Sequence, residues 1–104
     1  EIPFPGGVAD LARGEIQRTD GSTRELSGRE GEVLRYLAVH RGRVISRDEL
    51  LSRIWRLTPG TMETRTIDMH IARLRAKIEA DPANPRVLVT VRGKGYMFVD
   101  DMNS

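Results

Sequence analysis

Two Ser-x-x-Glu sequences, at residues 27–30 and 46–49, define where two helices of this chain begin. In such a capping box the serine side chain accepts a hydrogen bond from the backbone of the first turn, and the glutamate side chain accepts one from the serine N–H. The first box predicts a helix that begins at Gly28 and ends near His40, because Arg41-Gly42 supplies a basic last turn and a glycine cap. The chain must therefore pack two helices whose starts are set locally.

The segment after the second box continues with apolar residues at helical spacing. Thr58-Pro59-Gly60 ends this second helix, since proline and glycine are poor helix formers. Val44-Ile45, between the two predicted helices, is long enough only for a bridge or a brief strand. The predicted buried stripe of the second helix consists of Leu50, Leu51, Ile54 and Trp55.

The part of the chain before the first helix has β character. Val8–Leu11, Glu15–Arg18 and Thr23–Leu26 are short segments separated by glycine-containing turns. Asp20-Gly21 between two of them predicts a two-residue hairpin turn of type I′, in which both central residues have positive φ. We therefore expect a small antiparallel sheet at the start of the chain.

A third helix is predicted from about Glu63 to Ile78. When its residues are placed about 100° apart around the helix axis, the apolar side chains fall on one face and long cationic side chains fall on the opposite face. Its core stripe is Ile67, Ile71, Leu74 and Ile78, and its opposite face holds Arg65, Met69, Ala72, Arg73 and Ala76. Thr66, His70 and Lys77 lie on one flank, and Asp68 and Arg75 lie on the other. The opposite face suits a nucleic-acid groove, because small side chains permit close approach while arginine reaches bases and phosphates.

The end of the chain reads as a hairpin. Asp81-Pro82 and Asn84-Pro85 break the third helix. Arg86–Val91 and Tyr96–Val99 are then predicted strands, joined by the turn Arg92-Gly93-Lys94-Gly95. The tip of this hairpin carries two cations.

Charge is unevenly distributed along this chain of one-domain length. Residues 47–94 hold ten basic side chains against six acidic ones, whereas residues 1–46 hold seven of each. There is no cysteine, which excludes disulfides and thiolate metal sites and is typical of a cytoplasmic protein. No apolar run approaches the roughly 20 residues that span a bilayer, so no membrane contact is expected. The start at Glu1, without an initiator methionine, suggests a domain of a longer protein.

Together these elements predict an α+β fold of the winged helix-turn-helix type: an N-terminal antiparallel sheet, three helices and a C-terminal β-hairpin wing. In that fold the third helix enters the major groove of DNA, and the wing reaches phosphates or the adjacent minor groove. No enzyme is expected, because no nucleophile and base pair is evident.

Four ordered motifs together cover nearly the whole chain. They are Leu26-Ser27 with Glu30; residues 44–51 leading to Trp55; residues 65–71 with Arg73-Leu74-Arg75; and residues 90–96 with Phe98. These motifs resemble those of the OmpR/PhoB-type DNA-binding domains of bacterial two-component response regulators. The resemblance implies a four-stranded N-terminal sheet, a preceding receiver domain, and promoter binding commonly as head-to-tail dimers on direct repeats. It also implies that the loop 56–62 contacts RNA polymerase, and it implies no cofactor.

Carried over by position, the resemblance implies groove contacts from Arg65, Thr66, Met69 and Arg73 of the third helix, and from Thr90 and Arg92 of the wing. It implies phosphate contacts from Trp55, His70 and Arg75. From charge and placement we add Arg47, Lys94 and the flanking Lys77 as candidate DNA-binding residues.

Each of these residues also has a simpler interpretation. Arg73 is then an exposed arginine paired with an acid, Met69 has no task, His70 is packed or bonded to the backbone, and Trp55 is a core residue. A winged helix used for protein–protein contact is the main alternative function, although the cationic face of the third helix argues against it.

Other site types find little support in the sequence. Arg92-Gly93-Lys94-Gly95 lacks the strand-to-helix context of a phosphate-binding glycine loop. His40 and His70 are distant in sequence and have no cysteine beside them, so no metal site is expected. Asp100-Asp101 forms a solvated tail rather than a catalytic carboxylate pair.

Overall fold

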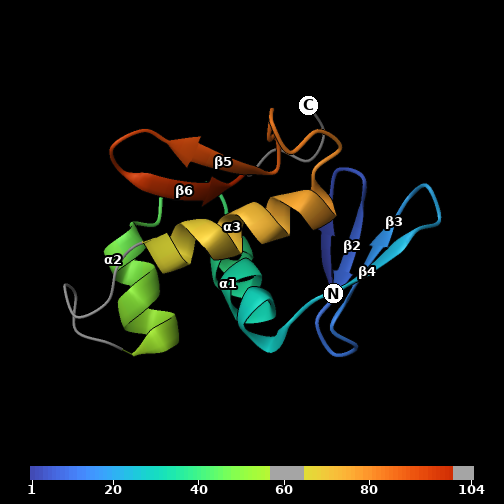
Figure 1. Ribbon diagram of the computed structural model, residues 1–104, viewed down its shortest axis with the longest axis horizontal. Helices are drawn as coiled ribbons and strands as arrows, with labels where there is room; N and C mark the ends of the chain where they lie inside the picture. Colours follow the sequence, from blue (N-terminus) through green and yellow to red (C-terminus); the bar gives the residue numbers. More distant parts are fainter. Residues whose placement is uncertain (57–64, 100–104) are drawn as a thin grey trace.

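The N-terminal quarter of the chain forms one antiparallel sheet in a computed structural model that describes residues 1–56 and 65–99 (Figure 1). Its strands are β1 (Ile2–Phe4), β2 (Gly7–Asp10), β3 (Glu15–Arg18) and β4 (Thr23–Glu25), hydrogen-bonded in sequence order. The four-stranded sheet is thus confirmed. The residue pattern alone predicted only the last three strands, because β1 is three residues long and contains Pro3.

The turn between β3 and β4 differs from the predicted type I′ turn. Gly21 has φ of +90°, but Asp20 does not have positive φ. The Gly21 N–H donates to the Arg18 carbonyl at 3.0 Å, and the Arg18 N–H donates to the Ser22 carbonyl at 2.9 Å. This is a three-residue loop in which only the last residue is left-handed. The Asp20 carboxylate favours it by accepting from the Ser22 N–H at 2.8 Å.

Helix α1 (Gly28–Val39) begins where the first capping box predicts. The Ser27 hydroxyl accepts from the Glu30 N–H at 3.1 Å, and the Glu30 carboxylate accepts from the Ser27 N–H at 3.0 Å. The helix ends at Val39, close to the predicted end near His40. The predicted cap is wrong, because His40 rather than Gly42 caps the helix and the last turn contains no basic residue.

The second helix consists of an α-helical turn, α2 (Arg47–Leu50), followed by a π-helical turn, η1 (Leu51–Trp55). Its capping box is only half formed. The Ser46 hydroxyl accepts from the Glu49 N–H, but the Glu49 carboxylate bonds instead to Tyr36 and Arg43. Arg56 is left-handed, with φ of 56°, and ends the helix there. The predicted stop at Thr58-Pro59-Gly60 lies outside the described residues.

The remaining elements are α3 (Arg65–Ile78) and a two-stranded antiparallel sheet of β5 (Leu88–Val91) and β6 (Gly95–Phe98). The predicted start of α3 at Glu63 lies outside the described residues. Strand β5 begins later than predicted, because the carboxylate of the buried Glu79 accepts hydrogen bonds from the N–H groups of Arg86, Val87 and Leu88. Glu79 thus occupies donors that a longer strand would use.

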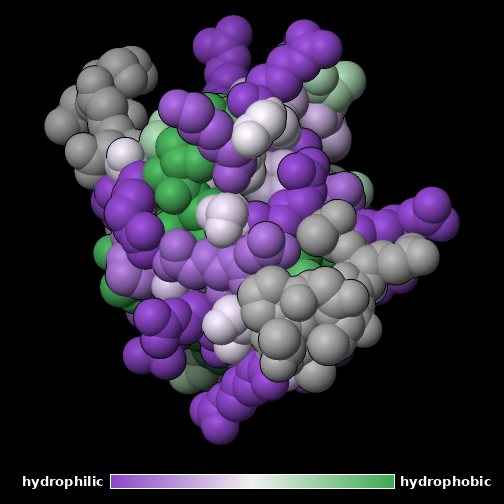
Figure 2. Space-filling view, turned by 90° about the vertical axis from the view of Figure 1, so that its left-hand side faces the viewer, coloured by the Kyte–Doolittle hydropathy of each residue, from purple (hydrophilic) through white to green (hydrophobic). Residues whose placement is uncertain are grey.

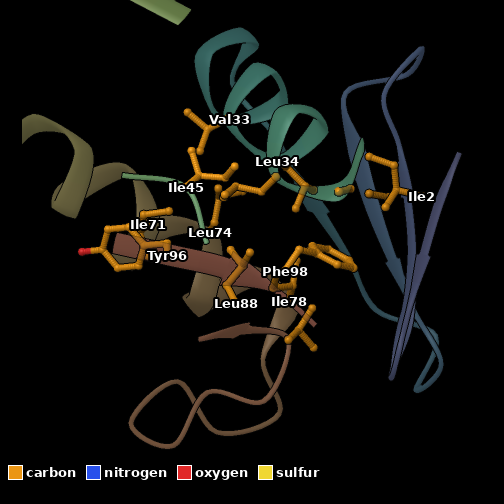
Figure 3. Close-up of a cluster of buried hydrophobic side chains, with 14 of the residues drawn as sticks. Ile2, Val33, Leu34, Ile45, Ile71, Leu74, Ile78, Leu88, Tyr96 and Phe98 are labelled. Atoms are coloured by element: carbon orange, nitrogen blue, oxygen red, sulfur yellow. The ribbon is translucent and has the colours of Figure 1, made fainter. Parts of the chain in front are cut away.

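All elements contribute to one hydrophobic core. Figure 3 shows Ile2 of the first sheet, Leu34 of α1 and Phe98 of β6 pointing into the same cluster. Ile45 forms an isolated antiparallel bridge with Tyr96, as the length of Val44-Ile45 predicted. The predicted core stripe of α3, Ile67, Ile71, Leu74 and Ile78, is buried throughout. No helix in the described part of the chain is long and apolar enough to cross a membrane.

Candidate nucleic-acid interface

The outer face of α3 carries long side chains that point to solvent. Arg65, Met69 and Arg73 are exposed, with the small residues Ala72 and Ala76 beside them. Neither arginine makes a hydrogen bond or ion pair with another described residue. The packing of Ile67 and Ile71 against the core holds this face outward, because residues half a helical turn away must point in the opposite direction. The structure thus brings together three of the predicted groove-contacting residues.

The β5–β6 hairpin, the wing, places its cations at the same end of the molecule. In Figure 1 the tip of the hairpin lies on the left, as does the beginning of α3. Arg92 and Lys94 are exposed at the tip, and neither bonds to another described residue through its side chain. Figure 2, which views this end, shows hydrophilic side chains around a small apolar patch. The end is therefore mainly polar, as an interface with a polyanion requires.

Arg75 connects α3 to the wing. Its Nε donates to the Leu88 carbonyl at 2.9 Å, and a terminal guanidinium nitrogen donates to the Thr90 hydroxyl at 2.7 Å. The guanidinium also lies 5.4 Å from the centre of the Tyr96 ring. Arg75 and Thr90 are therefore adjacent, and they fix the distance between helix and hairpin.

Asp68 is the centre of a second connection, which the sequence did not reveal. Its Oδ1 accepts from Arg47 Nε at 2.7 Å and from the Tyr96 hydroxyl at 2.5 Å. Burial acts to raise the pKa of Asp68, but the hydrogen bonds from Tyr96 and Arg47 outweigh it and lower the pKa. Burial and the Asp68 carboxylate both raise the pKa of Tyr96. The carboxylate thus joins α2, α3 and β6.

We expect Asp68→Asn to reduce the free energy of unfolding by about 1–2 kcal/mol at pH 7, because Arg47 and Tyr96 lose a shared anionic acceptor. Since the folded-state pKa lies below the ordinary 3.8, this stabilisation is present above pH 3.8 and is lost as the pH falls further. Urea denaturation of both proteins across pH tests this. The exposed Asp48→Asn serves as the control, and a difference for Asp68→Asn that persists at pH 2 would contradict the assignment.

Trp55 and His70 pack against each other on the flank of α3. The His70 ring meets the Trp55 ring edge-on, with 5.1 Å between centroids, and its Nδ1 lies 2.8 Å from the carbonyl oxygen of the half-buried Thr66. Arg29 of α1 lies 4.9 Å from the Trp55 ring centre and donates to the Ile54 carbonyl. His70 therefore has the backbone bond of its simpler interpretation. Arg29, which positions Trp55, was not predicted.

Lys77 lies apart from the exposed cations of α3. Its ammonium group is 2.5 Å from Oε1 of Glu30, whose side chain is only 5% exposed. Burial acts to raise the pKa of Glu30, but hydrogen bonds from Lys77 and the Ser27 N–H outweigh it and lower the pKa. This ion pair links α1 to the last turn of α3 and gives Lys77 a structural role.

No group of three or more potential metal-ligating side chains comes together among residues 1–56 and 65–99. The interface residues are arginines, a lysine, a threonine and a methionine rather than metal ligands. They form an exposed surface on α3 and the wing.

Comparison with known proteins identifies close relatives. Residues 21–98 match the family described as "Transcriptional regulatory protein, C terminal". The chain is 49% identical over 81 residues to the sensory transduction protein RegX3 of Mycobacterium tuberculosis, covering 78% of this chain and 35% of that protein. It is 41% identical over 98 residues to the probable transcriptional regulator ycf27 of Guillardia theta, covering 93% and 38%. The chain thus spans little more than a third of the length of these relatives.

Solved structures share the whole fold. The RstA DNA-binding domain of Klebsiella pneumoniae, in complex with the RstA box, superposes with a TM-score of 0.78 at 33% identity, covering 94% of this chain and 95% of that one. The DNA-binding domain of CpxR from E. coli superposes with a TM-score of 0.73 at 34% identity, covering 93% of each chain. These similarities confirm the expected arrangement of sheet, three helices and hairpin as a winged helix.

Proposed function

The chain belongs to the family of C-terminal domains of transcriptional regulatory proteins, the OmpR/PhoB-type winged helices, and from this we propose that α3 reads the major groove of promoter DNA while the wing contacts the adjacent minor groove. The family consists of DNA-binding output domains of response regulators and not of enzymes. The observation that carries the proposal is that Arg65 and Arg73 on the outer face of α3, and Arg92 and Lys94 at the tip of the wing, are all exposed.

The residues divide into two chemical roles. Arg65, Thr66, Met69 and Arg73 lie on or beside the outer face of α3, where arginine pairs with guanine and methionine touches the methyl group of thymine. Thr90 and Arg92 act from the wing, because arginine is favoured by the negative potential of a narrow minor groove. The remaining candidates bind phosphate: Arg47, Trp55, His70, Arg75, Lys77 and Lys94.

Arg47 and Arg75 combine a structural bond with a phosphate contact. A guanidinium group has five N–H donors, and the bonds described above use only some of them. The intramolecular bonds also hold each guanidinium in place before DNA arrives, which reduces the ordering cost of binding. Lys77 is the weakest of the phosphate candidates, since its ammonium is paired with Glu30.

We expect the affinity of the 104-residue chain for duplex DNA to fall steeply with salt, because bound cations displace counterions from phosphates. Four phosphate contacts correspond to a loss of roughly 100-fold between 50 and 200 mM salt. Fluorescence anisotropy with a labelled duplex at several salt concentrations measures the slope. A flat dependence, or no binding at low salt, would refute the proposed function.

The third helix and the wing tip should differ in what they contribute. We expect Arg73→Ala to lose about 1–3 kcal/mol on the preferred site and to relax base preference at one position. Lys94→Ala should weaken all sequences alike and reduce the salt slope by about one phosphate contact. Arg92→Ala should mainly lose preference for A·T-rich flanks. Selection from a random duplex pool for each variant tests this, and the opposite pattern for Arg73 and Lys94 would show that the two roles are reversed.

The partners of the whole protein follow from the family. We infer a phospho-receiver domain N-terminal to this chain, paired binding on direct repeats as a dimer, and action in the cytoplasm. Contact between the 56–62 loop and RNA polymerase is part of the same proposal, although nearly all of this loop lies outside the described residues. A dimer of the full-length protein in which only one subunit carries Arg73→Ala tests whether both subunits must bind DNA.

A further inference from the structure

Two large apolar side chains are exposed in the described part of the chain, and only one of them belongs to the proposed DNA interface. Met69, 45% exposed, lies on the outer face of α3, whereas Val39, 69% exposed, lies at the end of α1. Val39 borders a hollow of about 320 Å³ between α1 and η1, together with Arg35, Tyr36, Arg53 and other residues. DNA binding does not account for this apolar side chain.

Around the hollow, the cationic side chains are more available to a binding partner than the acidic side chains are. Arg35 and Arg53 are exposed, and neither makes a hydrogen bond or ion pair with another described residue. Of the neighbouring acids, Glu49 accepts hydrogen bonds from Arg43 and Tyr36, whereas the exposed Glu32 makes only a 3.6 Å ion pair with Arg29. The hollow therefore offers two exposed cations beside the apolar side chains of Val39 and Ile54, which complements a surface that is both acidic and apolar.

The hollow lies on a different side of α1 from the core. Helix α1 buries Val33, Leu34 and Leu37, and Arg35 and Val39 project from the opposite side of the helix. Helix α3 packs against the buried side. An occupant of the hollow therefore leaves the outer face of α3 free.

We propose that the hollow between α1 and η1 is a docking site for an acidic amphipathic helix of another protein. An aliphatic side chain of that helix packs on Val39, and flanking carboxylates pair with Arg35 and Arg53. This is the helix-in-groove mode of recognition, in which apolar residues three or four positions apart anchor the helix. The domain thus binds DNA through α3 and an acidic helix through the hollow between α1 and η1, and it links the two partners.

The test uses a fluorescent synthetic helix with leucines spaced three and four residues apart and glutamates at the flanking positions. A control peptide keeps the leucines and replaces every glutamate with glutamine, so that it does not bind the duplex through its charge. The titration is done on the 104-residue chain with a saturating duplex bound, so that DNA covers the cations of α3 and the wing. We expect the acidic peptide to bind at least about tenfold more tightly than the neutral one. Amide NMR shifts should locate it at Tyr36, Val39 and Arg53.

Three variants decide the outcome. Val39→Ser and the double variant Arg35→Glu/Arg53→Glu should each weaken the acidic peptide at least about tenfold, whereas Arg73→Ala should not change its affinity. Displacement of the peptide by DNA, equal binding of both peptides, or shifts confined to α3 would overturn the proposal. Val39→Ser should leave DNA affinity unchanged. If the duplex itself does not bind, the titration is repeated without it, so the two proposals fail separately.

Discussion

Replacing Gly95 with alanine is expected to reduce the free energy of unfolding by about 3–5 kcal/mol, through backbone strain and overpacking together. Gly95 has φ of +144°, a conformation that residues with a side chain rarely adopt. A Cβ atom there would lie 2.0 Å from the Ile45 carbonyl oxygen and 2.9 Å from Ser46 Cα. These are backbone atoms, and they cannot move aside without breaking the bridge between Ile45 and Tyr96. Thermal and urea denaturation measure the change.

Two other glycines separate the causes of this effect. Gly93→Ala also introduces a side chain at positive φ, +75°, but into open space, so it should lose only about 1 kcal/mol. Gly28→Ala lies in the first turn of α1 with open space around it and should be neutral or slightly stabilising. A loss for Gly95→Ala no larger than that for Gly93→Ala would show that the close approach to Ile45 is unimportant.

Lys77→Met is expected to reduce the free energy of unfolding by about 2–4 kcal/mol, because it leaves the buried Glu30 carboxylate without its cation. The loss is placed below that of a fully buried pair, since 24% of the Lys77 side chain is exposed. The double variant Glu30→Gln/Lys77→Met should recover part of the stability, because no charge then remains buried. Denaturation of the two single variants, the double variant and the wild type completes a thermodynamic cycle.

As the pH falls, the contribution of Glu30 to the free energy of unfolding should change in opposite directions in the wild type and in Lys77→Met. In the wild type the folded-state pKa of Glu30 lies below the ordinary 4.5, so the ion pair stabilises above pH 4.5 and is lost as the pH falls further. In Lys77→Met, burial without the cation should raise the Glu30 pKa, so this variant should gain stability as the pH falls from 7 toward 5. Equal pH profiles would contradict the role of the pair. A loss of DNA affinity in folded Lys77→Met would show that Lys77 contacts DNA in addition to its pairing with Glu30.

The features that the sequence predicted well are those encoded by near neighbours. Ser27 and Glu30 specify the start of α1 within one turn, and the spacing of Ile67, Ile71 and Leu74 specifies which face of α3 is buried. The exposed face of α3 follows automatically from the buried one. The candidate groove residues on α3 were accessible to prediction for this reason.

The features that the sequence did not reveal depend on distant residues. Asp68 meets Arg47 and Tyr96, which are 21 and 28 positions away, and Lys77 meets Glu30 across 47 positions. A charge pattern on a helical wheel cannot distinguish a cation that faces solvent from one that has a partner on another element. The half-formed capping box has the same origin, because Tyr36 and Arg43 take the Glu49 carboxylate.

Three charged side chains join α3 and the residue that follows it to the hairpin. Asp68 bonds to Tyr96 of β6, Arg75 bonds to Leu88 and Thr90 of β5, and Glu79 bonds to the N–H of Leu88. These contacts fix the distance and orientation of the hairpin relative to α3. One inserted base pair displaces a sequence element by about 3.4 Å and rotates it by about 34–36° around the duplex. A helix and a hairpin held in one relative position cannot follow that change. For the proposed mode of binding, the domain therefore selects the spacing between its major-groove and minor-groove elements as strictly as it selects the bases themselves.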